Sequence, residues 1–115
     1  MALKYSIERF EFHDLKTKQF ITILGYCYQE NNETVEYSVK LDGKEVDFEL
    51  FRPGREDIIN GYDLGFKNTH IGFRLTVPCD IEPTSIEVNA YTDTLSECIL
   101  NYDQRKINKY RDKRE

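Results

Sequence analysis

Two runs of alternating apolar and polar residues, one on each side of Asp42-Gly43, restrict the possible folds more than any other feature. Apolar side chains occupy every second position in residues 35–41 and again in residues 46–50. A period of two is the period of a β-strand. A two-residue Asp-Gly loop between two such runs favours a type I′ turn. The sequence therefore predicts a β-hairpin in the middle of the chain.

The side chains on either side of the turn also predict the register of this hairpin. With Leu41 opposite Lys44, every apolar residue of one strand faces an apolar residue of the other, and a shift by one residue would break the pattern. The expected pairs are Lys40–Glu45, Val39–Val46, Tyr37–Phe48 and Val35–Leu50.

Further strand patterns, separated by turn-forming residues, fill the rest of the chain. They cover residues 5–12, 20–28, 71–77, 86–90 and 95–102. In the first of them the apolar parity changes between Ile7 and Phe10, which predicts a β-bulge at Glu8-Arg9. Seven or eight short strands without a convincing helix favour an all-β fold, an antiparallel immunoglobulin-like β-sandwich. We expect residues 1–102 to form this domain and residues 103–115 to be a charged linker or a frayed helical tail.

Length, charge and cysteine content limit the class of protein. A chain of 115 residues fits one domain, and its net charge of −5 argues against nucleic-acid binding. We expect no direct membrane insertion, because there is no apolar run of about 20 residues. The chain begins without a signal-peptide pattern, which predicts a cytoplasmic protein. Three cysteines then predict reduced thiols, against a less favoured Cys27–Cys98 disulfide of the immunoglobulin type.

No hydrolase, transferase or nucleotide-binding motif is visible, so we expect neither a catalytic site nor a cofactor. The acidic residues Glu36, Asp47 and Glu49 share one face of the hairpin. They could bind a hard cation, but no loop of Asp, Asn and Gly gathers them. We interpret them as a solvated acidic face and expect no metal.

Aromatic residues offer a second candidate site. Tyr26, Tyr28, Tyr62 and Phe66 could together form a platform for a sugar or for a partner protein. Aromatic residues on strands and in connections are more often part of a core. Both interpretations stay open at this point.

The third candidate lies in the irregular segment 51–78. Arg55 and Asp57 are two residues apart and can form an ion pair, while Gly72-Phe73 opens the next strand. A glycine in a strand often marks a place where another backbone approaches closely. We predict that Arg55 and Asp57 fix the connection against Gly72 as a structural element, with a ligand or partner contact as the alternative.

Four short motifs in this order carry a resemblance: Gly25-Tyr26, the strand and turn around Asp42-Gly43, Arg55-Glu56-Asp57-Ile58, and Gly72-Phe73. They resemble the small β-sandwich module found beside family 2 glycosyltransferase domains in bacterial cell-surface polysaccharide proteins. The family pattern has Trp where Tyr26 stands and Val where Ile58 stands.

This resemblance implies a non-catalytic accessory domain whose partner is a glycosyltransferase catalytic domain in the same polypeptide. It would place the domain in the cytoplasm, at the inner face of the membrane through the full-length protein. The alternative is a stand-alone carbohydrate-binding β-sandwich module, whose partner would be the carbohydrate itself.

Overall fold

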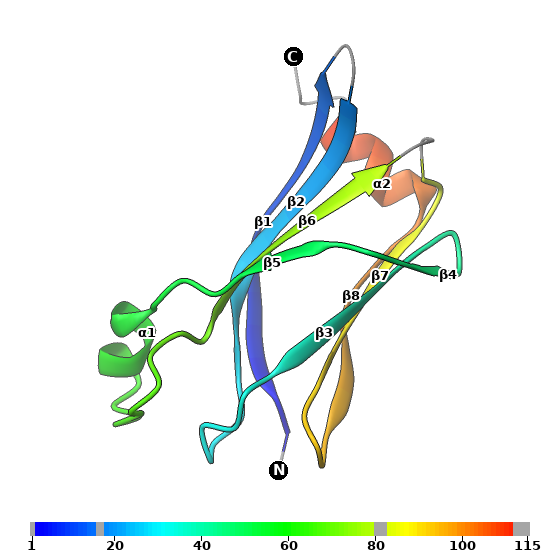
Figure 1. Ribbon diagram of the computed structural model, residues 1–115. Coiled ribbons are helices and arrows are strands. Elements are labelled where there is room, and N and C mark those ends of the chain that lie inside the picture. Colours follow the sequence, from blue (N-terminus) through cyan, green and yellow to red (C-terminus); the bar gives the residue numbers. More distant parts are fainter. Residues whose placement is uncertain (1, 16–17, 80–82, 112–115) are drawn as a thin grey trace.

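Two four-stranded antiparallel sheets pack face to face in the computed structural model of the chain (Figure 1). The structure describes residues 2–15, 18–79 and 83–111. The first sheet has the order β1 (Lys4–Leu15), β2 (Lys18–Tyr28), β6 (Gly72–Cys79), β5 (Glu49–Phe51). The second has the order β4 (Lys44–Val46), β3 (Glu36–Leu41), β7 (Ile86–Tyr91), β8 (Ser96–Tyr102). The predicted all-β sandwich is confirmed, and it carries two short helices, α1 (Glu56–Gly61) and α2 (Gln104–Arg111).

The core lies between the two sheets and uses one face of each strand. Side chains alternate along β2, β6 and β7, so that every second residue points inward. The central strands supply the most deeply buried of these residues: Ile21, Ile23, Val39, Phe73, Leu75, Val77, Ile86 and Val88. Each such side chain contributes about 1.5–3 kcal/mol when it is buried, so the sandwich is stabilised mainly by this layer.

The predicted hairpin is confirmed at its turn and wrong at its far end. Asp42 and Gly43 have φ values of 53° and 82°, as a type I′ turn requires. The pairs Val39–Val46, Lys40–Glu45 and Leu41–Lys44 form as expected. Beyond Val46 the chain leaves this sheet, and β5 pairs with β6 of the other sheet instead.

Two predicted pairs are therefore corrected: the β3–β4 ladder ends at Val39–Val46, before Tyr37 and Phe48, and Leu50 lies opposite Leu75 instead of Val35. The alternation of apolar residues continues unbroken through the change of sheet. An inward-facing residue looks the same in either layer, so the local pattern could not reveal the crossing.

The predicted bulge in β1 is confirmed. Ile7 pairs with Gly25 and Arg9 pairs with Leu24, which leaves Glu8 as the extra residue. The bulge brings Ile7 toward the core and places Phe10 and Phe12 within it, whereas Tyr5 remains 38% exposed.

The connection between β5 and β6 folds over the outer face of the first sheet and contains the unpredicted helix α1 (Figure 1). Glu56 and Asp57 lie in its first turn, where negative charge favours the helix terminus. Ile59 is buried with Tyr28 and Ile71 in a second, smaller core. Six residues are too few to show a clear helical period in the sequence, so this helix escaped detection.

Residues 104–111, within the predicted linker or frayed tail, form helix α2. The Asp103 side chain accepts a hydrogen bond from the backbone N–H of Lys106 at 3.0 Å, which caps the helix. Ile107 is fully buried in the main core, and Tyr110 packs beside Phe10. Within the described ranges, no helix is both long enough and apolar enough to cross a membrane.

The cysteines are free thiols in this fold. Cys27 and Cys79 point into the core, and Cys98 is exposed on β8. Burial raises the pKa of the Cys27 thiol to about 12, so this thiol stays protonated and unreactive at neutral pH.

Candidate functional site

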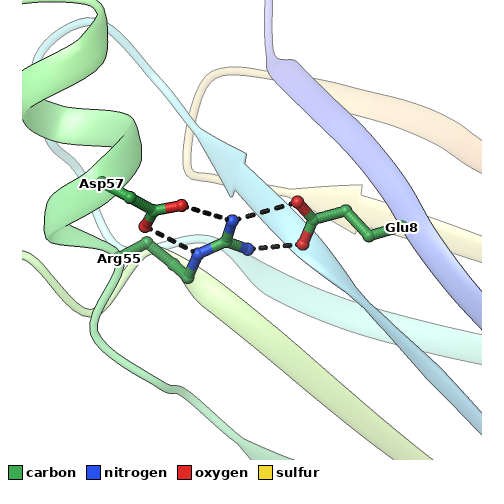
Figure 2. A network of polar contacts seen from close by, with 3 residues as sticks. All are labelled: Glu8, Arg55 and Asp57. Atoms are coloured by element: carbon green, nitrogen blue, oxygen red, sulfur yellow. Dashed lines mark hydrogen bonds and ion pairs between the residues drawn. The ribbon is translucent and has the colours of Figure 1, made fainter.

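Arg55 lies between two carboxylates, one near it in the sequence and one far away (Figure 2). Its Nε and Nη2 donate to Oδ1 and Oδ2 of Asp57 at 3.0 and 2.9 Å. Its Nη1 and Nη2 donate to Oε1 and Oε2 of Glu8 at 2.5 and 3.0 Å. The guanidinium therefore bridges the β5–β6 connection to β1, two segments that are 47 residues apart at the contact.

Local structure fixes the position of each member of this network. Arg55 precedes α1, where its carbonyl accepts the N–H groups of Ile58 and Ile59, and its own N–H donates to Thr69 O at 2.9 Å. Asp57 follows in the first turn of α1. Glu8 is the extra residue of the β1 bulge. Sequence analysis predicted both the bulge and the Arg55–Asp57 pair but missed Glu8 as the third partner.

The charges of the network are strongly coupled. Hydrogen bonds to Asp57 and then to Glu8 raise the pKa of the Arg55 guanidinium above its ordinary value. The hydrogen bond from Arg55 lowers the pKa of the Asp57 carboxyl. The Arg55 side chain is 18% exposed, whereas the two carboxylates are 41% and 64% exposed. The partly buried cation thus stays charged, while solvent reaches both anions.

Four of the five N–H bonds of the guanidinium are used within the protein. A ligand that took two donors from one side of this fork would have to displace Asp57 or Glu8. The geometry is that of a clamp between two segments, the β5–β6 connection and β1.

Gly72 lies against the same connection. A Cβ atom at this position would be 2.7 Å from Pro53 Cγ, 2.8 Å from Pro53 O and 3.0 Å from Arg55 Cγ. The N–H of Gly72 donates to Pro53 O at 3.1 Å. The close approach expected of this glycine therefore occurs, and its neighbour is the segment that carries Arg55.

The other motif residues converge on this place. Tyr26 pairs with Gly72, and Gly25 pairs with Phe73, across β2 and β6. The Arg55 guanidinium lies 5.6 Å from the centre of the Tyr26 ring. Phe73 faces the opposite side, is 1% exposed and packs on Tyr37 in the main core. Of the predicted residues, Arg55, Asp57 and Gly72 thus form one cluster, and Phe73 is a core residue.

The four candidate platform residues meet but do not form a flat exposed surface. The Tyr26 and Tyr28 rings are nearly parallel with centres 6.2 Å apart, and the Tyr28 and Phe66 rings meet edge to face with centres 5.5 Å apart. Tyr28 is only 7% exposed, whereas Tyr62 is 62% exposed. Burial and then a hydrogen bond with Tyr62 raise the pKa of Tyr26. Tyr26, Tyr28 and Phe66 pack with Ile58 and Ile59 of α1 in the second core.

The acidic residues of the hairpin do not gather. Glu36 forms an ion pair with Arg52 at 3.2 Å, and Glu49 lies on β5 of the other sheet. Throughout residues 2–15, 18–79 and 83–111, no group of three or more His, Cys, Asp or Glu residues could hold a metal ion.

A hollow of the described surface lies elsewhere, along the edge of β1. This β1 groove has a volume of about 560 Å³ and is lined by residues 7–13 together with Tyr102 and Tyr110. A smaller hollow of about 340 Å³ lies where the chain leaves β4, beside Tyr37 and Tyr91. Neither contains the Arg55–Asp57 pair.

Comparison of the chain with protein-family models, with curated proteins and with solved structures finds no match. Its function therefore has to be inferred from the residues and contacts described above.

Proposed function

We propose that this chain is a non-catalytic accessory domain of a bacterial glycosyltransferase that acts in cell-surface polysaccharide synthesis. One observation carries the proposal: three of the motifs behind the resemblance, far apart in sequence, contact one another. Arg55 lies over the Tyr26 ring, and Gly72 leaves room for the Arg55 segment. Because these motif residues depend on one another for their contacts, we expect them to occur together in one sequence, as they do in the resembling module.

The chemistry of this cluster supports a scaffold role. Four of the five guanidinium donors of Arg55 are satisfied by Glu8 and Asp57. The Tyr26 and Tyr28 rings support α1 through the second core. These contacts hold the β5–β6 connection in one position, which gives a neighbouring domain a fixed surface to contact.

We also propose that the sandwich is immunoglobulin-like. Lettered in chain order with β4 as C′, the first sheet has the order A-B-E-D and the second C′-C-F-G. The constant immunoglobulin domain has sheets A-B-E-D and C-F-G. The strand order supports this assignment.

The partner in this proposal is the glycosyltransferase catalytic domain, carried by the same polypeptide and held in the cytoplasm at the inner face of the membrane. Carbohydrate binding by the isolated domain is the alternative. Its support is the 62% exposure of Tyr62 beside the near-parallel rings of Tyr26 and Tyr28. The burial of Tyr28 leaves little of that ring for stacking on a sugar, so we favour the accessory domain.

The test begins with the reading frame that encodes these 115 residues. We expect it to encode a transferase domain as well, and we expect sugar transfer from nucleotide-sugar donors by the full polypeptide but not by this domain alone. Transfer by the isolated domain, or a reading frame without a transferase domain, would overturn the proposal.

A second experiment separates the alternative. Bacterial oligosaccharides are titrated into the isolated domain while amide chemical shifts are followed by NMR, with Tyr62→Ala as the variant. Saturable shifts around Tyr62 that the variant abolishes would favour the carbohydrate-binding module. The accessory domain predicts no saturable shift in this region.

A further inference from the structure

One edge of the sandwich is much longer than the others. Of the four edge strands, β4 and β5 have three residues each and β8 has seven, whereas β1 has twelve. Proteins usually protect a long edge with lysine, proline or bulges. β1 has its bulge at Glu8, and Tyr110 of α2 packs on its inward-facing residue Phe10. Residues 9–15, however, pair with β2 without a break and contain neither Lys nor Pro. Among the described residues, β2 is the only strand paired with β1.

The β1 groove follows this edge. It is lined by seven consecutive residues of β1, from Ile7 to His13. Neighbouring residues of a strand point to opposite faces, so a groove that touches all seven runs along the backbone rather than along one face. Grooves of this kind receive an extended segment, which adds a strand to the sheet through main-chain hydrogen bonds.

The charges beside the groove indicate which segment fits. Arg9 and Glu11 lie on the outer face of β1, 65% and 41% exposed, with Arg9 Nε 3.2 Å from Glu11 Oε1. Phe10 between them points inward and is 5% exposed. An antiparallel segment should place an acidic residue opposite Arg9 and a basic residue opposite Glu11. Residues 9–11 of a second copy have this pattern when read in the opposite direction.

We propose that two copies of this chain pair through their β1 edges, antiparallel, about a two-fold axis at Phe10. Arg9 then lies opposite the partner's Glu11, and Glu11 lies opposite the partner's Arg9, as a self-complementary two-fold interface requires. The Phe10 residues of the two copies become neighbours on the inner face. The ladder spans residues 9–11, which is as long as the three-residue ladders that hold β4 and β5. This inference goes beyond the proposed function and does not depend on it.

The first test is sedimentation velocity of the wild-type chain at about 10 μM to 1 mM, the range that suits a small interface. We expect reversible dimers, with concentration-dependent amide shifts concentrated at residues 9–11 of β1. Arg9→Glu alone and Glu11→Arg alone each place like charges opposite one another, and each should weaken dimerisation by about tenfold or more.

The decisive test is complementation. An equimolar mixture of Arg9→Glu and Glu11→Arg places opposite charges together again, so heterodimers should form at concentrations where each variant alone is monomeric. The double variant, with both charges exchanged, should dimerise like the wild type. Arg74→Glu makes the same charge change on the same face, but on the central strand β6, and it should leave dimerisation unchanged.

Any of the following results would overturn the inference: a wild-type chain that stays monomeric up to about 1 mM, dimers that are insensitive to the charge changes, or variants that fail to complement one another. Dilution shifts concentrated on another strand would do so as well, as would the finding that β1 pairs with a different protein. Circular dichroism of each variant confirms that loss of dimers does not reflect unfolding.

Discussion

At the scale of single residues, the contacts of Arg55 depend on the shape of its guanidinium group as well as on its charge. Its guanidinium holds Glu8 and Asp57 at the same time because its donors form a fixed planar fork. A lysine would keep the positive charge and lose the fork. Stability should therefore depend on the identity of this cation and not only on its charge.

The first prediction follows from this geometry. Arg55→Lys should lower the free energy of unfolding by about 1 kcal/mol, a modest value because solvent reaches the carboxylates. Urea unfolding measures the loss. The matched control is Arg9→Lys, since Arg9 is 65% exposed and, among the residues that the structure describes, forms its ion pair with Glu11 alone; it should stay within about 0.5 kcal/mol of the wild type. Equal midpoints for the two variants would contradict a clamp at Arg55.

A second residue-scale prediction concerns Gly72. The first atom of any side chain would lie 2.8 Å from the carbonyl oxygen of Pro53, so the backbone has to move. Gly72→Ala should therefore destabilise the fold by about 1–3 kcal/mol. Gly61→Ala is the control, because a Cβ atom there meets nothing within 4 Å. If both alanines were tolerated equally in urea unfolding, the close approach at Gly72 would not constrain the fold.

At the scale of elements, the turn of the hairpin is tied to a second turn. Oδ1 of Asp42 accepts hydrogen bonds from the Thr84 N–H at 2.6 Å, the Thr84 hydroxyl at 2.7 Å and the Ser85 N–H at 3.0 Å. The hydroxyl bond is the largest of the causes that lower the pKa of Asp42. These bonds connect the β3–β4 turn to the start of β7.

This contact predicts a dependence of stability on pH. The folded-state pKa of Asp42 lies below its unfolded value of about 4. Its contribution to stability is thus complete above about pH 5 and is lost as the pH falls through the folded pKa. Asp42→Asn should remove part of the acid destabilisation seen in urea midpoints between about pH 5 and 2. Asp93→Asn, in an exposed turn, is the control, and identical pH profiles for the wild type and Asp42→Asn would disprove the contribution.

Helix α2 carries the second prediction at this scale. Ile107 is fully buried in the main core although most of its neighbours are polar or charged. Ile107→Ala should cost about 2–5 kcal/mol, whereas Lys109→Ala on the exposed side of α2 should change stability by less than about 0.5 kcal/mol. Chemical denaturation compares the two. A neutral Ile107→Ala would indicate that the sandwich is stable without α2.

At the scale of the whole molecule, the success of sequence-based prediction depended on the distance between partners. The Asp42-Gly43 turn and the bulge at Glu8 were predictable because their signals lie within a few residues. The Arg55–Glu8 contact was not, since its partners are 47 residues apart and surface carboxylates are common. Ile107 was underestimated because one isoleucine in a charged segment gives no helical pattern.

In the candidate site, too, features with signals close together in the sequence were predictable and those that depend on distant segments were not. The prediction that Arg55, Asp57 and Gly72 lie together rested on turn chemistry and glycine spacing, and the three residues are neighbours in the structure. The aromatic residues were harder to interpret, because the sequence does not show that α1 folds over Tyr28. Exposure of an aromatic ring is decided by the element that covers it, and that element was too short to predict.

The passage of the chain from β4 into β5 has a consequence for local opening. These two three-residue strands belong to different sheets, yet only two residues separate them. When one strand detaches, it leaves little chain to anchor the other, so the two should open as one cooperative unit. Native-state hydrogen exchange should then give similar opening free energies for bonded amides of β4 and β5, well below those of β2. The two sheets would thus open first at the same place, where the chain passes from β4 to β5.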